Sequence, residues 1–443
     1  VTSVDLVIHA KYVIPIEPDS SVVLEDMAVV VDKGIIVAIV PHAEAHKRFV
    51  AAETVHLREH ALMPGMVNAH THVSMNLLRG LADDLPLMEW LTQQMWPTEG
   101  RLVSAEFCKA GARHAMAEML RCGTTCFNDM YFFPDAIAEE VDAVGMRAAL
   151  AATVFCFPSN WAASADEYFA KGLAAADRFA DHDRITFTLG PHAPYTVDDA
   201  TFERVHSTAT ERGMRVHVHL HETAGECEHS LAGNTEEMVC HKSDAKCRPF
   251  ENLDRLGLIN DRLVAAHCTH LTDAEITRMA EAKASVVHCP NSNLKLGSGF
   301  CAVAKLDAAG VNVCIGTDSS ASNNSLDMLA ELKLTAVLAK GVSGDTTAIP
   351  ADVALKMATL NGAKALGIDS KVGSIVVGKH ADLTAVRLDA LELAPMYSVI
   401  SHLVYVAGRE SVTDVWVNGA RLLDCGRLTT LDVDALVVEA RRW

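Results

Sequence analysis

The chain has 443 residues, of which 50% are hydrophobic, and 57 acidic against 38 basic residues give it a net charge of −19 at pH 7. A chain of this length can bury one large core together with an accessory domain. The acidic surface disfavours nucleic acid and anionic membranes, and no apolar run is long enough to span a bilayer. We therefore expect a small-molecule ligand, with no nucleic-acid and no membrane partner.

The cysteine spacing favours a reduced, cytoplasmic protein. The twelve cysteines include no C-x-x-C pair, and the start of the given sequence has no signal-peptide pattern. The segment 233–249 contains Cys240, His241 and Cys247 but no paired-ligand spacing. We expect it to be a solvated loop rather than a metal site.

Both ends of the chain predict short β-strands. Apolar and polar residues alternate at 4–9, 27–31 and 35–40, and the pattern returns at 378–386 and 412–419. Strands of this length and spacing indicate a small sheet. We expect residues 1–61 and 374–443 to form the two parts of one β-sandwich.

The middle of the chain alternates short apolar strands with helical stretches. The expected strands are 62–69, 124–128, 147–153, 185–190, 214–220, 263–266, 284–288 and 311–316. Eight such units favour a (β/α)8 TIM barrel over residues 62–373 rather than an open doubly wound sheet. The first unit has no G-x-G-x-x-G, so a dinucleotide site is not supported.

Residues able to do chemistry follow these expected strands. They are His70 and His72 after the first, Asp129 after the second, His192 after the fourth, His219 with Glu222 after the fifth, His267 after the sixth, His288 after the seventh and Asp318 after the eighth. The carboxyl ends of the strands of a closed barrel converge on one face. His70 and His72 also point the same way, because alternate strand residues share a face.

Three of the histidines and acids near these strands have a structural explanation as well. Asp129 could equally cap the helix that follows it. His288 could simply be packed in the core. His217 is expected to face away from His219, or into another layer of the barrel, in a structural role.

His70, His72, His219 and Asp318 together offer three imidazoles and one carboxylate. Such a donor set suits a divalent metal ion that keeps one coordination position for water. A metal at such a site lowers the pKa of bound water. Asp318 can also accept a proton from that water. Glu222 can reach a substrate atom beside the attacked carbon, and His267 can orient the water and help to pass its proton. The set predicts a metal-dependent hydrolase.

This set of motifs resembles the amidohydrolase superfamily. The likeness is carried by Pro-Gly-Met-Val-Asn-Ala-His-Thr-His at 64–72, His219 with Glu222, His267-Cys268, Gly-Thr-Asp at 316–318 and Gly-Lys-His-Ala-Asp-Leu at 378–383. It covers essentially the whole chain and implies a (β/α)8 barrel with a β-sandwich from both termini. Superfamily members with two metal ions carry a bridging Lys after strand four, and residues 190–195 contain none. The resemblance therefore implies one ion, Zn²⁺, although these ligands also accept Fe²⁺ or Mn²⁺.

Further runs resemble the 5'-methylthioadenosine/S-adenosylhomocysteine deaminases, at 77–87, 90–91, 96–99, 129–132 and 321–324. This resemblance implies hydrolytic deamination at C6 of an adenine nucleoside, with Glu222 protonating N1 and with His267 and Asp318 handling the water proton. It also implies that Glu99 binds the ribose hydroxyls and that His192, Glu222 and Asp318 contact the substrate. Two carboxylate oxygens can accept from both hydroxyls of a diol. A homo-oligomer is compatible with such barrels.

One stretch departs from the family pattern. Some members carry arginines after the third strand that hold the homocysteine carboxylate, but residues 149–158 contain no Arg. Apolar side chains suit a methylthio group, which favours 5'-methylthioadenosine over S-adenosylhomocysteine or adenosine. The alternatives are a hydrolase of a free N-heterocycle (an s-triazine hydrolase, or a guanine or cytosine deaminase), which has no need of Glu99 with His192, and a non-catalytic scaffold.

Overall fold

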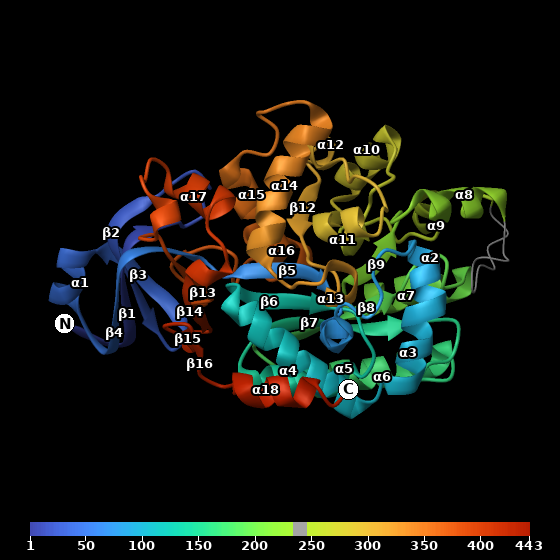
Figure 1. Ribbon diagram of the computed structural model, residues 1–443, viewed down its shortest axis with the longest axis horizontal. Helices are drawn as coiled ribbons and strands as arrows, with labels where there is room; N and C mark the ends of the chain where they lie inside the picture. The colour runs from blue at the N-terminus through green and yellow to red at the C-terminus, as the bar shows by residue number, and fades with distance from the viewer. Residues whose placement is uncertain (234–245) are drawn as a thin grey trace.

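The computed structural model describes residues 1–233 and 246–443, which contain two sheets of eight strands each. Figure 1 shows the sheet of the two termini at one end of the molecule and the barrel at the other. Cys240 and His241 lie outside the described residues, and Cys247 is half-buried. No disulfide joins two cysteines of the described ranges, and none of the helices there is long and apolar enough to cross a membrane.

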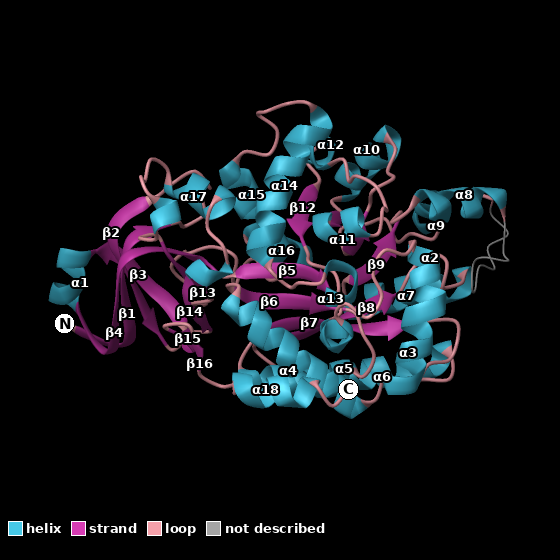
Figure 2. Cartoon of the chain, in the orientation of Figure 1, coloured by secondary structure: helices cyan, strands magenta, loops and turns pink. Residues whose placement is uncertain are grey.

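The larger sheet is parallel throughout, in the order β12-β11-β10-β9-β8-β7-β6-β5. Its strands are β5 (Met66–Thr71), β6 (Thr124–Asp129), β7 (Arg147–Val154), β8 (Ile185–Pro191), β9 (Val216–Leu220), β10 (Leu263–His267), β11 (Ser285–His288) and β12 (Asn312–Ile315). Helices alternate with these strands and surround the sheet in Figure 2. The expected (β/α)8 barrel is confirmed.

The helices between and after the barrel strands are mostly short. They are η1 (Val73–Leu78), α2 (Leu87–Glu89), η2 (Trp90–Met95), α3 (Trp96–Leu102), α4 (Ala105–Arg121), α5 (Pro134–Val144), α6 (Ala165–Arg178), α7 (Asp199–Arg212), α8 (Ala224–Ala232), α9 (Pro249–Arg255), α10 (Asp273–Ala282), α11 (Pro290–Lys295), α12 (Val303–Ala308), α13 (Ser320–Asn323), α14 (Met328–Ser343), α15 (Ala351–Met357) and α16 (Leu360–Leu366).

The second sheet has the order β16-β15-β14-β13-β4-β1-β2-β3. Its elements are β1 (Thr2–Val13), β2 (Leu24–Asp32), β3 (Ile35–Pro41), α1 (His42–Arg48), β4 (Phe49–Pro64), β13 (Leu383–Arg387), η3 (Leu391–Leu393), α17 (Val399–Tyr405), η4 (Arg409–Ser411), β14 (Val412–Val417), β15 (Ala420–Asp424), β16 (Arg427–Leu428) and α18 (Val433–Ala440). Successive residues of a strand face opposite sides, so Ile8 and Val7 enter two different cores. β13 pairs antiparallel with β4, which joins the two ends of the chain in one sheet.

The expected strand 62–69 is divided at Gly65. Residues up to Pro64 continue β4 in the terminal sheet, and β5 begins in the barrel at Met66. A Cβ atom at Gly65 would lie 2.1 Å from side-chain atoms of Thr125, so only glycine lets the chain pass at this point. The sequence did not reveal this passage from one sheet to the other, because the residues on both sides of Gly65 are buried and apolar.

Hydrogen bonds join β5 to the segment that follows β12, and so close the barrel. Asn68 Oδ1 accepts from the Thr317 N–H at 3.0 Å, and its Nδ2 donates to Thr317 Oγ1 at 2.7 Å. The Asp318 N–H donates to the His70 carbonyl at 2.9 Å. A Cβ atom at Gly316 would lie 2.8 Å from His70 N, so glycine permits this approach. The seam therefore holds Asp318 beside His70.

A buried ion pair fastens the barrel to the terminal sheet. Arg147, the first residue of β7, donates from Nε and Nη2 to the two carboxylate oxygens of Asp382 at 2.7 and 3.1 Å. Both side chains are buried. The Asp382 carbonyl also accepts from the Gly65 N–H, at the point where the chain enters the barrel. The pair therefore stabilises the junction of the two sheets.

Replacing Arg147 by Met should lower the free energy of unfolding by about 3–5 kcal/mol, because the Asp382 carboxylate would stay buried without a counter-ion. Urea unfolding followed by circular dichroism measures the loss. In the control, Arg178→Met removes a more exposed pair with Glu139 and should cost no more than about 1 kcal/mol. Equal losses in the two variants would contradict the role given to Arg147.

Candidate active site

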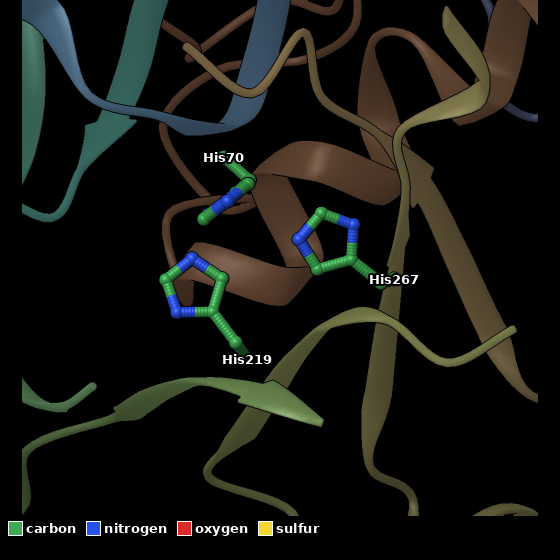
Figure 3. A group of neighbouring side chains, drawn as sticks. All are labelled: His70, His219 and His267. Atoms are coloured by element: carbon green, nitrogen blue, oxygen red, sulfur yellow. The ribbon is translucent and has the colours of Figure 1, made fainter. Parts of the chain in front are cut away.

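Five side chains able to bind a metal meet at the carboxyl end of the barrel. His70 lies in β5 and His72 just after it, His219 lies in β9, His267 ends β10, and Asp318 follows β12. Figure 3 shows the rings of His70, His219 and His267 turned toward a common centre. The convergence that the strand ends predicted is present in the structure.

The distances between the donor atoms match those around a bound metal ion. Asp318 Oδ1 lies 3.3 Å from His70 Nε2 and 3.2 Å from His72 Nε2, and the Nε2 atoms of His72 and His219 are 3.3 Å apart. Ligand atoms 2.0–2.1 Å from a tetrahedral zinc ion are about 3.3–3.4 Å from one another. The side chains as they stand therefore fit one ion of this size.

His267 belongs to the same cluster. One ring nitrogen each of His70, His219 and His267 lie within 4.8 Å of one another, and so do donor atoms of Glu222, His267 and Asp318. His70 Nε2 is buried and makes no hydrogen bond within the described part of the chain. A buried nitrogen without a hydrogen bond is costly unless a cation or another partner meets it.

Three of the imidazoles direct Nε2 toward the centre of the cluster, because their Nδ1 atoms form hydrogen bonds on the opposite side of the ring. The acceptors for His72, His219 and His267 in turn are the Met130 carbonyl at 2.5 Å, the His192 carbonyl at 2.7 Å and Asn293 Oδ1 at 2.9 Å. An acceptor at Nδ1 holds the ring proton there and leaves the lone pair of Nε2 free.

His70 is oriented by another histidine, His217. Nδ1 of His70 lies 2.8 Å from Nε2 of His217, and both rings are buried in the barrel. With a cation on Nε2 of His70, its Nδ1 carries the proton and His217 accepts it. The expectation that His217 faces away from His219 was wrong, because the rings of both residues contact His70, at 4.9 and 4.8 Å between ring centres. The sequence indicated only a structural role for His217. Its spacing of two residues from His219 was the available signal, because that spacing puts both side chains on one face of β9.

The negative charge of Asp318 is balanced within the cluster by a proton on one of the imidazoles. Burial lowers the pKa of His70 to about 4 and that of His219 well below its usual range, so both are neutral. Burial also opposes charge on His72, but the hydrogen bond and the charge of Asp318 outweigh it and raise the pKa of His72 to about 9. A divalent cation supplies the positive charge that this proton otherwise provides, so its binding displaces the proton.

Asp318 and His267 have strained backbones, with φ of 59° and 73°. The left-handed region is uncommon for residues other than glycine and clusters at functional sites. Ser292 and Ser322 donate to Asp318 Oδ2 at 2.6 and 2.9 Å, and the Ser319 N–H donates to Oδ1 at 2.8 Å. These bonds fix the direction of the carboxylate toward the histidines.

Glu222 lies buried beside the metal-binding cluster. Its Oε1 is 3.8 Å from Nε2 of His267, and burial raises the pKa of its carboxyl. A carboxyl with a raised pKa can hold a proton near neutral pH and act as a general acid.

A second buried carboxyl, Glu226, fixes the backbone that carries Glu222. Its two oxygens accept from the N–H groups of His221 at 3.1 Å and Glu222 at 2.8 Å. Thr269 Oγ1 donates to the Glu222 carbonyl at 2.7 Å. The sequence prediction missed Glu226, although its place three residues after the N-cap Thr223 of α8 is that of a capping acid.

Asp129 and His288 serve the site indirectly or not at all. Asp129 Oδ1 accepts from the Val73 N–H at 2.7 Å and so supports the turn after His72. It is not the N-cap of the next helix, α5, where Phe133 occupies that position. His288 is buried at the end of β11 and does not line the substrate cavity.

A largely apolar cavity opens above the metal-binding cluster. Its walls include Met75, Trp90, Leu91, Met95, Trp96, Met130, Tyr131, Phe132, Phe155 and Tyr195. Glu222, Glu99 and His192 supply polar groups. Among residues 1–233 and 246–443, no Lys or Arg lines this cavity.

Glu99 and His192 offer hydrogen-bond acceptors in the cavity. Tyr131 donates to Glu99 Oε1 at 2.7 Å, and burial raises the pKa of Glu99 to about 7. His192 Nδ1 lies 2.8 Å from Thr196 Oγ1, which itself donates to the Ala193 carbonyl. The ring proton of His192 is therefore on Nδ1, and its Nε2 can accept.

The amidohydrolase family model matches residues 61–422. A 5-methylthioadenosine/S-adenosylhomocysteine deaminase of Teredinibacter turnerae is 42% identical over 445 residues, covering 100% of this chain and 97% of its own. The protein of that name in Saccharophagus degradans is 40% identical, covering 100% and 96%. The structure of an adenosine deaminase from Xanthomonas campestris with bound zinc is 52% identical, covers 100% and 98%, and has a TM-score of 0.96. Atrazine chlorohydrolase from Arthrobacter aurescens, 22% identical with a TM-score of 0.89 over 99% of each chain, shares the fold.

Replacing His217 by Ala should weaken zinc binding about 10- to 100-fold, because His70 would lose the partner that fixes its ring. Competition with a chelator measures the affinity. His217→Gln is the matched control, since its amide oxygen can accept from His70 Nδ1 and should retain most of the affinity. Unchanged affinity in a folded alanine variant would refute this role.

Proposed function

The chain belongs to the amidohydrolase family, and on that premise we propose that it is a zinc-dependent deaminase of adenine nucleosides. One observation carries the proposal. A single cavity holds donor atoms spaced for a zinc ion, the buried carboxyl of Glu222 beside them, and the acceptors of Glu99 and His192. The relatives named as deaminases, and the zinc in the Xanthomonas campestris structure, support it.

In the proposed reaction water adds at C6 of the adenine ring, the bond from C6 to the exocyclic nitrogen breaks, and ammonia leaves. His70, His72, His219 and Asp318 would hold the zinc ion through the donor atoms that they present to the centre. When bound, zinc acts as a Lewis acid and lowers the pKa of water. The product is the inosine analogue of the substrate.

The remaining steps are proton transfers by this chain's own residues. Glu222 delivers a proton to N1 as C6 is attacked, and burial, which raises the pKa of its carboxyl, favours the protonated form that this role needs. His267 carries its ring proton on Nδ1, against Asn293, so its Nε2 accepts a proton from the attacking water. Asp318 takes the proton of the hydroxyl now on C6 and passes it to the leaving nitrogen, which departs as ammonia while the C6 carbonyl forms. His267 then returns its proton to Glu222, whose Oε1 is 3.8 Å from its Nε2.

Glu99 and His192 would bind the sugar. A carboxylate can accept from both hydroxyls of a ribose, and Tyr131 holds Glu99 in place through one oxygen. The free Nε2 of His192 accepts from the nucleoside. Phe155 stacks on the His192 ring at 4.5 Å and fixes its plane.

The substrate that suits the cavity is 5'-methylthioadenosine. The stretch after β7 forms an aromatic wall, in which Phe155 lies 4.9 Å from Phe157 and Phe157 lies 5.6 Å from Trp96, between ring centres. Arg147, at the start of β7, is bound to Asp382 instead. A thioether packs well against aromatic rings, whereas the amino-acid tail of S-adenosylhomocysteine would meet no basic residue among the described cavity residues.

The alternatives have less support. A free base offers no hydroxyls to Glu99, and the likeness to triazine hydrolases and guanine deaminase is one of fold alone. A non-catalytic scaffold has no need of the ligands and their supporting hydrogen bonds. Adenosine is the second candidate substrate, because the similar structure from Xanthomonas campestris is named an adenosine deaminase. The cysteine spacing supports a cytoplasmic location.

A substrate panel with ammonia detection tests the function. We expect the highest kcat/KM for 5'-methylthioadenosine, then adenosine and S-adenosylhomocysteine, and little turnover of adenine, which has no ribose for Glu99 and His192. A preference for guanine or melamine over every nucleoside would overturn the proposal.

Replacing Glu222 by Gln should lower kcat at least about 100-fold, because the amide cannot give a proton to N1. Zinc content should stay at the level of the unchanged protein, since Glu222 is not among the proposed ligands. Elemental analysis and ammonia release measure the two quantities. A variant with near-normal turnover would remove Glu222 from the mechanism.

Replacing Phe155 by Arg should raise the ratio of kcat/KM for S-adenosylhomocysteine to that for 5'-methylthioadenosine about tenfold, because the tail carboxylate gains a charged donor. Phe155→Leu keeps the wall neutral and should leave the ratio unchanged. If arginine also leaves it unchanged, this wall does not select the substrate tail.

A further inference from the structure

Four histidines line a pocket of the terminal sheet. Figure 1 shows the elements that carry them, α1, β1 and β4, at the opposite end of the molecule from the barrel. They are His9 in β1, His42 and His46 in α1, and His56 in β4. None of them takes part in the proposed deamination. The pocket has a volume of about 250 Å³ and is open to solvent along one side, where His46 and His56 are exposed.

The backbone itself brings the four rings together. His9 and His56 are direct partners in the parallel pairing of β1 with β4, so their side chains leave the same face of the sheet. His42 and His46 are four residues apart, so they lie on the same side of α1. Histidines at this helical spacing are a recurrent pair of metal ligands.

The rings are in contact. The His9 ring lies between those of His46 and His56, with centres 4.6 and 5.0 Å apart and planes within 18° and 12° of its own. The His42 ring meets His9 edge-on at 4.9 Å.

His42 carries the donor form that a metal ion requires. His42 Nε2 lies 2.8 Å from the Met27 carbonyl and 3.2 Å from that of Ala10, so its proton is on Nε2 and Nδ1 has a lone pair. Burial, aided by the three neighbouring histidines, lowers the pKa of His9 to about 4. His46 and His56 are exposed, and their rings can turn to bring nitrogens to a common point.

We propose that His9, His42, His46 and His56 form a second site for a divalent transition metal ion of the kind that prefers imidazole, with Zn²⁺ as the representative ion. Such an ion would tie α1 to β1 and β4, at a place where the helix is only seven residues long. The rim of the pocket carries Asp26, Arg58 and Lys11, and the ammonium of Lys11 is paired with Glu59.

A competing cluster, Asp414 with Asp424 and Cys425, is a poorer site. Arg421 is bonded to Asp414 and contacts Asp424 at 3.0 Å, so a guanidinium group already neutralises these carboxylates. A cation there would have to displace Arg421. Within the described residues, the hydrogen bonds of the histidine rings go to the carbonyls of Met27 and Ala10 and not to a cation. Their ring nitrogens are not yet gathered within 4.8 Å of one another, so binding requires the exposed rings of His46 and His56 to turn.

The test is a Zn²⁺ titration of the full chain with its catalytic site already loaded, by calorimetry and by elemental analysis after dialysis. We expect a further equivalent of zinc to bind, with a rise in Tm. His46→Gln and His56→Gln should each weaken this equivalent about tenfold or more and abolish the Tm rise, while deaminase activity stays unchanged.

Two controls keep the result specific. His402→Gln, which changes a partly exposed histidine on α17, should leave the second equivalent intact, and so should Cys425→Ser. The proposal is overturned if no second equivalent binds, if the His46 and His56 variants bind it as tightly as the unchanged chain, or if Cys425→Ser removes it. Because activity is read separately, failure of this site is distinguishable from failure of the catalytic proposal.

Discussion

The closure of the barrel between β5 and the segment after β12 is the constraint on which the rest of the site depends. Asn68 bonds to Thr317 through both ends of its amide, and the Asp318 N–H donates to the His70 carbonyl. Because Gly316 has no side chain, the two segments come close enough for these bonds. One donor carboxylate therefore comes from the end of the barrel and two imidazoles from its beginning. Their spacing of 3.2–3.3 Å is a product of this seam rather than of any local sequence.

Around that seam the structure fixes each side chain of the metal-binding cluster twice. The strand or turn places the side chain, and a hydrogen bond on its far side sets its orientation. A carbonyl or an amide oxygen holds Nδ1 of three histidines, His217 lies behind the fourth, and two serines hold Asp318. Such supports reduce the reorganisation needed when a cation binds. The same principle extends to Glu222, whose backbone is held by Glu226 and Thr269. The polar groups of the site are thus rigid, while the cavity walls above them are apolar.

Much of the fold and of the candidate site could be predicted from the sequence, because the carboxyl ends of the barrel strands meet on one face. The alternation of short apolar strands with helical stretches predicted the barrel, and the chemistry of the residues after those strands predicted the gathering of His70, His72, His219, His267 and Asp318. The division of residues 62–69 at Gly65 was not predictable, since both halves are buried and the crossing shows only in a contact with Thr125. The partners of His70 and Glu222 were missed for a related reason. His217 and Glu226 act through hydrogen bonds whose geometry exists only in the folded chain, and Asp129 supports a turn 56 residues before it.

The seam also sets an order of events during synthesis of the chain. His70 and His72 leave the ribosome early, but Asp318 and the glycine that lets it approach are made some 250 residues later. Until β12 has been translated and laid beside β5, the nascent chain holds only part of its donor set. The terminal sheet is completed later still, when β13 pairs with β4. A cation that met the chain before β12 was made would therefore find the donor set without its Asp318 carboxylate.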